Sequence, residues 1–242
     1  MSYYSAVVQR HLDAARSSLP MRTLATEQMS PALDELSLKF ALWTRASKCD
    51  GLDVGCGDGL ATIAALARGG HVMAVDPDPA ALHRLLVRVP SEQYRRLKVR
   101  EGTLPELDFK FARFSAVHAA RVLHLLEPEA LQESLRKFFR WLYPAGKLFV
   151  SVLTPAGSFW QPCRVELARR NMSREQWPGY FDDIGRMFPH WSGAATSIHL
   201  IDQGILRREL EAAGFGIEEI GCYSLPWDSE QVCCAVLARC QL

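Results

Sequence analysis

The sequence predicts an α/β fold in which a mostly parallel, seven-stranded sheet is covered by helices on both faces. Three observations lead to this class. Short apolar runs typical of strands alternate with amphipathic helical stretches along most of the chain. The 242 residues are 48% hydrophobic and 23% charged, which suits one large globular domain. A glycine-rich turn joins the first strand-like run to the helix that follows it.

The order of the elements favours a single domain with four parts. Residues 1–48 form a predicted N-terminal helical cap, interrupted at Ser30-Pro31, and residues 49–153 form a core of alternating strands and helices. Residues 154–202 are predicted to be an aromatic-rich insertion after the fifth strand, lying over the sheet, and residues 203–242 resume the alternation. Strands are expected at 51–54, 71–75, 97–100, 114–120, 147–153, 217–223 and 232–238, and helices at 60–68, 79–89, 128–142 and 203–213.

Composition excludes several classes of protein and of site. Lys and Arg number 28 against 27 Asp and Glu, so a net charge of +1 gives no electrostatic reason to expect nucleic acid or an anionic membrane as partner. The seven cysteines form no Cys-x-x-Cys pair and no zinc-ligand spacing, and their odd number argues against a disulfide scaffold. No stretch is apolar for the length of a bilayer. We therefore expect a cytoplasmic protein that holds no metal.

The glycine-rich turn is the strongest indication of a ligand site. It spans Gly55-Cys56-Gly57-Asp58-Gly59, directly after the strand that contains Asp53. Glycine allows the backbone to turn tightly and to approach a ligand closely. The spacing is G-x-G-x-G, whereas most dinucleotide sites have G-x-G-x-x-G and place a pyrophosphate at the helix N-terminus. The turn therefore favours a ligand other than NAD.

Asp76 stands at the predicted carboxyl end of the second strand, 17 residues beyond Gly59. A carboxylate in this place can accept hydrogen bonds from both hydroxyls of a ribose. The alternative is that Asp76 caps the helix that begins at Pro79. The two roles are compatible, and both remain open at this point.

These segments resemble the first two motifs of class I S-adenosylmethionine-dependent methyltransferases. Three later segments are similar to the same family in the same order: Glu101–Pro105, Phe114–Leu126 and Leu142–Leu148. The similarity covers about residues 49–153, with a weaker match at 206–215 and in the last strand. It implies a Rossmann-like, doubly wound fold and an enzyme that uses S-adenosylmethionine and releases S-adenosylhomocysteine.

The resemblance also implies residues that would hold the methionine part of this cofactor. Gly55, Cys56 and Gly57 would face it, and Asp53 would support its amino group from behind the turn. Ala119 and Ala120, which end the fourth strand, would border the methionine chain beneath the acceptor.

The nucleoside part would be held by a second group of residues. The resemblance implies that Asp76 holds the ribose and that Pro77 packs on the adenine. Thr103 stands where the family often has an acidic residue against the adenine amino group, so a hydroxyl replaces a carboxylate there. Leu104 would offer its backbone N–H to the ring.

Methyl transfer is a direct displacement, so orientation and exclusion of water supply much of the acceleration. A general base is needed only where the acceptor must lose a proton. His190 and His199 are the first candidates for such a base because they lie in the insertion, and His118 and His124 are further candidates. A lone histidine is also a common structural group, so no catalytic residue is assigned from the sequence.

The aromatic residues of the insertion have two interpretations. Trp160, Tyr180 and Trp191 either line an apolar acceptor pocket or form a satellite core beneath a long loop. Tyr3 and Tyr4 at the N-terminus are candidates for a lid over the cofactor.

The favoured function is transfer of a methyl group to an oxygen, a nitrogen or a carboxyl group of a small-molecule acceptor. A protein methyltransferase and a non-catalytic cofactor-binding sensor or partner domain are the alternatives, and a nicotinamide-dependent reductase is the least favoured. The oligomeric state is not predicted.

Overall fold

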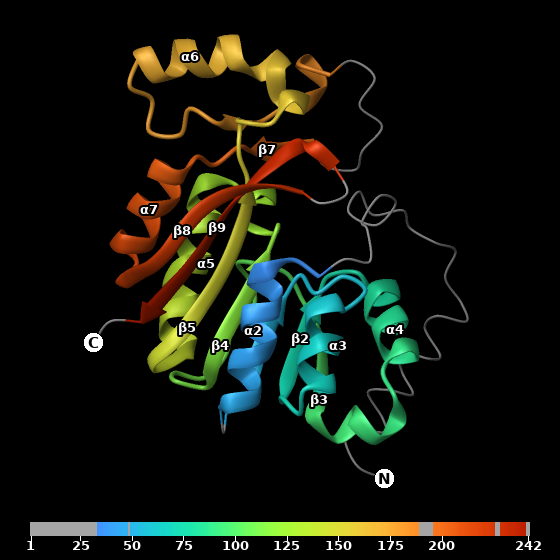
Figure 1. The fold of residues 1–242 in the computed structure, drawn as a ribbon. Coiled ribbons are helices and arrows are strands. Elements are labelled where there is room, and N and C mark those ends of the chain that lie inside the picture. The colour runs from blue at the N-terminus through green and yellow to red at the C-terminus, as the bar shows by residue number, and fades with distance from the viewer. Residues whose placement is uncertain (1–32, 48, 189–195, 226–227, 241–242) are drawn as a thin grey trace.

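The computed structural model describes residues 33–47, 49–188, 196–225 and 228–240, and its centre is one seven-stranded sheet (Figure 1). The strand order is β3-β2-β1-β4-β5-β9-β8. Strands β1 to β5 are parallel, and β9 is antiparallel to both β5 and β8. The strands are β1 Gly51–Val54, β2 Val72–Asp76, β3 Leu97–Glu101, β4 Phe114–Ala120, β5 Leu142–Leu153, β8 Phe215–Leu225 and β9 Asp228–Cys240. The prediction of a mostly parallel, Rossmann-like sheet is confirmed.

Helices cover both faces of this sheet, as the alternation of elements predicts. One face carries α2 (Glu35–Ala46), α3 (Leu60–Ala67) and α4 (Pro79–Arg88), and the other carries α5 (Pro128–Trp141) and α7 (Gln203–Ala212). Successive strand residues point to opposite faces, so Ala116 packs on the α2 side and Val117 on the α5 side. Among the helices of the described ranges, none is long and apolar enough to cross a bilayer.

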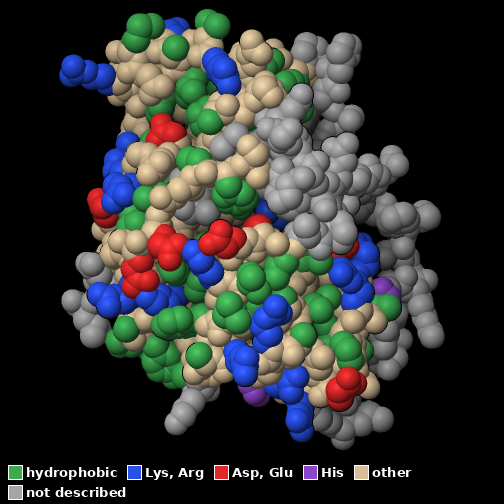
Figure 2. All heavy atoms as spheres, viewed as in Figure 1, with side chains coloured by type: hydrophobic (Ala, Val, Ile, Leu, Met, Phe, Trp, Pro, Cys, Tyr) green, Lys and Arg blue, Asp and Glu red, His purple; other side chains and the backbone are tan. Residues whose placement is uncertain are grey.

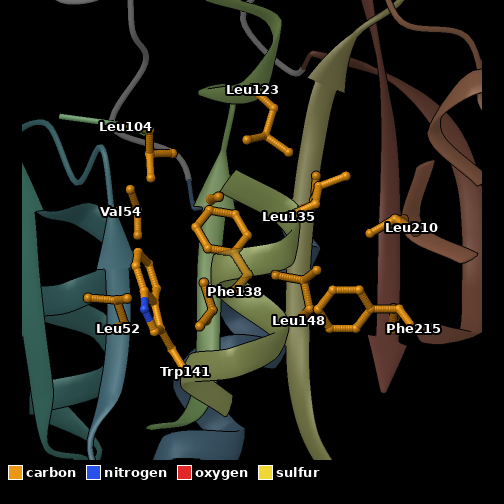
Figure 3. Close-up of a cluster of buried hydrophobic side chains, with 14 of the residues drawn as sticks. Leu52, Val54, Leu104, Leu123, Leu135, Phe138, Trp141, Leu148, Leu210 and Phe215 are labelled. Carbon is orange, nitrogen blue, oxygen red and sulfur yellow. The ribbon is translucent and has the colours of Figure 1, made fainter. Parts of the chain in front are cut away.

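The larger core lies between the sheet and α5. Phe138 and Trp141 of α5 are fully buried, and Figure 3 shows the Trp141 ring beside Leu52 and Val54 of β1. Burial of large apolar side chains is the main favourable contribution to folding. This core therefore fixes β1 and β4, whose carboxyl ends lie next to each other in the sheet.

The adjacency of β1 and β4 creates a topological switch point. The chain leaves β1 for α3 on one face, and it leaves β4 for η2 (Leu123–Leu125) and then α5 on the other face. In open α/β sheets, ligands bind in the crevice outside the carboxyl ends of strands at such a point.

The predicted N-terminal helical segment is seen as α2. Asp34 caps this helix, because its side chain accepts a hydrogen bond of 2.7 Å from the backbone N–H of Ser37. Phe40 is fully buried against the sheet. The remainder of the predicted segment, with Tyr3 and Tyr4, lies outside the described residues.

The insertion follows β5 directly and continues beyond the carboxyl end of that strand, not over a face of the sheet (Figure 1). Its elements are η3 Ser158–Cys163, α6 Arg164–Met172, β6 Tyr180–Phe181, η4 Ile184–Arg186 and β7 Ile198–His199. Trp160 is only 1% exposed and packs with Phe181, Ile184 and Ile198. The satellite-core interpretation is therefore correct for Trp160, whereas Trp191 lies outside the described residues.

Close backbone packing at Gly179 joins the middle of the insertion to its carboxyl-terminal end. The carbonyl oxygen of Gly179 accepts a hydrogen bond of 2.8 Å from Leu200, and a Cβ at position 179 would lie 1.9 Å from the Leu200 carbonyl oxygen. We expect Gly179→Ala to lower the free energy of unfolding by about 1–3 kcal/mol, because the backbone must move to accept the methyl group. Gly221→Ala is the matched control, since a Cβ there meets nothing within 4 Å. Urea unfolding of both variants checks this, and equal stabilities would contradict it.

Strand β5 begins earlier than the sequence predicts. The expected helix runs to Leu142 and the expected strand begins at Lys147, but β5 already pairs with β4 at Leu142. The ladder then resumes between Ala116 and Lys147, so the intervening residues loop out of the register. Ala145 adopts a φ of +62° within this irregularity.

Candidate cofactor and acceptor site

The glycine turn after β1 is held in left-handed backbone geometry. Gly55, Gly57 and Gly59 have φ values of +63°, +52° and +78°. A Cβ at Gly55 would lie 2.4 Å from Cγ2 of Val122, so no side chain fits there. Among the described residues, a Cβ at Gly57 would meet nothing within 4 Å. The turn therefore leaves open space beside Gly57, where a ligand can approach the backbone.

The two other residues of the turn, Cys56 and Asp58, contact the protein around them. Burial raises the pKa of the Cys56 thiol well above its ordinary value, and the nearby carboxylates add to this effect, so the group stays protonated. Asp58 accepts a hydrogen bond of 2.7 Å from Nε of Arg84, and its carbonyl accepts one of 2.9 Å from Arg88. These contacts attach the turn to α4.

Asp76 ends β2 and contacts the turn directly. Asp76 is 8% exposed, and its Oδ2 accepts a hydrogen bond of 2.8 Å from the Gly57 N–H. Oδ1 accepts one of 2.9 Å from the Asp78 N–H. Burial raises the pKa of this carboxyl, and the two N–H groups oppose that shift. A carboxylate oxygen has two lone pairs, so each oxygen can still accept a ligand hydroxyl.

The helix-cap alternative for Asp76 is wrong. Asp78 caps α4, because its Oδ1 accepts a hydrogen bond of 2.8 Å from the Ala80 N–H. Pro79 is the first residue of the helix, and the cap is the residue immediately before it. Asp76 is thus two residues too early for the cap and lies beside the glycine turn.

The loop after β3 lies next to Asp76. The Gly102 N–H donates a hydrogen bond of 3.2 Å to the Asp76 carbonyl, and Thr103 and Pro77 are both exposed. Leu104 is 6% exposed and belongs to the core. The structure therefore brings the predicted nucleoside-binding residues to one edge of the sheet, and their contacts with an adenine remain a prediction.

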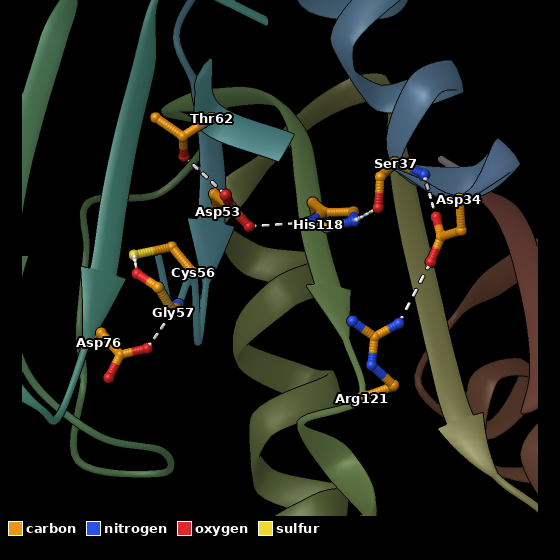
Figure 4. Close-up of polar contacts among 9 residues, drawn as sticks. All are labelled: Asp34, Ser37, Asp53, Cys56, Gly57, Thr62, Asp76, His118 and Arg121. Carbon is orange, nitrogen blue, oxygen red and sulfur yellow. Dashed lines mark hydrogen bonds and ion pairs between the residues drawn. The ribbon is translucent and has the colours of Figure 1, made fainter. Parts of the chain in front are cut away.

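Asp53 is buried behind the turn and has two side-chain partners. It is 2% exposed, and its Oδ2 accepts a hydrogen bond of 2.6 Å from the Thr62 hydroxyl. Its Oδ1 lies 2.7 Å from Nδ1 of His118, whose Nε2 lies 3.0 Å from Oγ of Ser37 (Figure 4). Asp53 and His118 are register partners on β1 and β4, which no local pattern in the sequence reveals. His118 is therefore a structural partner of Asp53, with both ring nitrogens engaged.

Ala119 lies in the hydrophobic core. It is fully buried and shares the α5 face of β4 with Val117, the face opposite to Asp53. Ala120, the last residue of β4, is partly exposed. Ala120 is therefore better placed than Ala119 to border a ligand at the end of the strand.

The two predicted general bases have different outcomes. His190 lies outside the described residues. His199 in β7 is fully buried, with ring centroids 5.2 Å from Trp177 and 5.7 Å from Tyr180. Burial, with smaller contributions from Arg121 and His199, lowers the pKa of His124 in η2 to about 3, and burial lowers that of His199 to about 4. Strand β7, which carries His199, lies against η2, which carries His124. The insertion is therefore packed against the segment that follows β4, and both rings are neutral at neutral pH.

Comparisons with known proteins agree with this geometry. A family model described as a methyltransferase domain matches residues 52–146, from β1 into β5. An uncharacterised methyltransferase of Synechocystis sp. is 28% identical over 158 residues, which is 64% of this chain and 72% of that protein.

Solved structures share the fold. A SAM-dependent methyltransferase from Methanosarcina mazei has a TM-score of 0.63 at 18% identity, covering 80% of this chain and 92% of that one. The 1,6-didemethyltoxoflavin-N1-methyltransferase of Burkholderia thailandensis, solved with 1,6-didemethyltoxoflavin and S-adenosylhomocysteine, has a TM-score of 0.60 at 19% identity, covering 99% of this chain and 87% of that one. The family match spans the glycine turn and Asp76, so over this stretch the chain is similar to methyltransferase domains, and the solved S-adenosylmethionine-dependent methyltransferases share its fold.

Proposed function

We propose that this protein is an S-adenosylmethionine-dependent methyltransferase that modifies a small molecule, bound where the carboxyl ends of β1, β2 and β4 meet. The observation that carries the proposal is the contact between the Gly57 N–H and the Asp76 carboxylate at 2.8 Å. This contact places a hydrogen-bonding carboxylate beside an open stretch of backbone at the switch point of the sheet.

The residues at this edge fit the cofactor of the family. The free space beside Gly57 suits its methionine part, and the spare lone pairs of Asp76 suit the ribose hydroxyls. Pro77, Thr103 and the backbone of Leu104 would hold the adenine. When bound, S-adenosylmethionine supplies an electrophilic methyl group on a sulfonium sulfur.

The chain contributes orientation and exclusion of water to the reaction. A displacement at carbon needs the acceptor atom in line behind the methyl group, and holding it there removes much of the entropic barrier. The His199 ring is neutral but fully buried, so we assign it no proton transfer with an acceptor at the open edge. An acceptor that is already deprotonated requires no general base.

Three observations support a small-molecule acceptor. The insertion is a compact unit with its own core, and it packs against η2 at the end of β4, which restricts the room for a long peptide. Basic and acidic side chains are interspersed over the face in Figure 2, which gives no broad field of one sign for a charged polymer. The solved relative from Burkholderia thailandensis carries a small molecule in its structure.

Transfer of a labelled methyl group tests the proposal. We expect the enzyme, given S-adenosylmethionine with an isotopic methyl label and a cell extract that retains its small molecules, to place the label in a low-molecular-mass product that is separable from the cofactor. Asp76→Ala under the same conditions is the control and should transfer little label. Label recovered only in the protein fraction would instead establish a protein methyltransferase.

A further inference from the structure

A row of hydrogen-bonded polar groups connects α3 and β1, the two elements on either side of the glycine turn, to the N-terminal helix α2. Figure 4 shows these groups reaching from α3 across β1 and β4 to α2 and the residue that follows β4. The members in order are Thr62, Asp53, His118, Ser37, Asp34 and Arg121, joined at 2.6, 2.7, 3.0, 2.7 and 3.3 Å. The link from Ser37 to Asp34 passes through the Ser37 backbone N–H.

The chemistry of the groups fixes the direction of the central hydrogen bond. A carboxylate can only accept hydrogen bonds, so the proton between Asp53 and His118 lies on Nδ1 of the ring. Nε2 then accepts from the Ser37 hydroxyl when the ring is neutral and donates to it when the ring is charged. In both states His118 donates to Asp53, and Ser37 holds the far side of the ring.

Packing makes this arrangement rigid. Ser37, His118 and Asp53 are 6%, 3% and 2% exposed. The His118 ring stacks on Phe40 of α2 at a centroid distance of 4.9 Å and an interplanar angle of 22°. Asp34 also accepts a hydrogen bond of 3.3 Å from the hydroxyl of Tyr223 on β8, which anchors the start of α2. The Asp53 carboxylate therefore has little freedom to rotate.

We propose that His118 is a positioning residue, which holds the Asp53 carboxylate in the orientation needed for the amino group of the cofactor's methionine part, with Ser37 of α2 as its second anchor. This inference rests on the proposed function, and in particular on the role of Asp53. Burial of a carboxylate costs free energy, and a nearby cation offsets this cost. The ammonium group of the ligand supplies such a cation. Helix α2 thus completes the cofactor site without touching the ligand.

Replacement of His118 by leucine and by asparagine separates positioning from a purely structural role. We expect His118→Leu to bind S-adenosylhomocysteine roughly tenfold more weakly, because the donor to Asp53 is lost. Its affinity for 5′-methylthioadenosine, which has the nucleoside but no amino-acid part, should be unchanged. His118→Asn places an amide N–H near the position of Nδ1 and should restore most of the lost affinity. Isothermal titration calorimetry measures all three.

A matched pair of serine variants provides a milder version of the same test. Ser37 and Ser134 are both buried hydroxyls on helices, but Ser134 bonds only within α5, to the Ala130 carbonyl. We expect Ser37→Ala to weaken S-adenosylhomocysteine binding a few-fold and Ser134→Ala to leave it unchanged. This pair also carries the test if His118→Leu fails to fold.

The outcomes are distinguishable from failure of the proposed function. Equal losses for both ligands in His118→Leu, or no loss for either, would overturn the positioning role. A wild-type protein that binds neither ligand would instead overturn the proposed cofactor site.

Discussion

Asp76→Ala is expected to weaken binding of S-adenosylhomocysteine by about 1.5–3 kcal/mol, or roughly 10–150-fold, because a charge-assisted contact to the ribose is lost. Isothermal titration calorimetry measures the change. Asp76 also accepts the Gly57 N–H at 2.8 Å, so the alanine variant additionally releases the turn. Asp76→Asn keeps one neutral acceptor for that N–H and should show a smaller loss.

The neighbouring carboxylate is the control for this variant. Asp78 caps α4 and has no proposed contact with the ribose, so Asp78→Ala should lower stability by about 0.5–2 kcal/mol and change the affinity little. An Asp76→Ala protein with wild-type affinity would mean that the ribose is held elsewhere.

Gly57→Ala is expected to abolish most cofactor binding, whereas the free energy of unfolding should fall only by the cost of backbone strain. The φ of +52° disfavours alanine, so we expect a loss of stability of about 1–2 kcal/mol. The added methyl group meets no atom of the residues that the structure describes within 4 Å and projects into the space that we assign to the cofactor. The affinity for S-adenosylhomocysteine should therefore fall roughly 5–150-fold, from overpacking of about 1–3 kcal/mol.

The chain offers a closely matched control at Gly69, which follows α3. Gly69 has a φ of +92°, and a Cβ there also meets nothing within 4 Å. Gly69→Ala should thus cost similar stability and leave the affinity unchanged. Equal affinities of the two variants would show that the space beside Gly57 is not the cofactor site.

Much of the fold could be predicted because its signals are local. The glycine turn ends β1 and begins α3 as expected. Asp202 caps α7, with its Oδ1 accepting a hydrogen bond of 2.8 Å from the Ile205 N–H. Such features depend on residues within one or two turns of each other, so spacing alone encodes them. The alternation of strands and helices then leaves a parallel sheet as the economical arrangement.

Part of the site was beyond local reasoning. His118 reads as a lone histidine, and its partner Asp53 is 65 residues away in the sequence. Trp160 has the same apolar character in a pocket and in a satellite core, and only its neighbours in space distinguish the two. Two carboxylates, Asp76 and Asp78, both precede α4 closely enough to be its cap, and the backbone geometry at Pro79 decides between them.

The sequence by itself determined the fold class, the glycine turn and the place of Asp76 at the end of a strand, since each follows from spacing and backbone preference along a short stretch. The tertiary structure decided which side chains meet across the sheet, above all that α2 reaches Asp53 through Ser37 and His118. The physical reason is that strand register and helix docking are set by packing of the whole core, which brings together groups that no short stretch of chain contains.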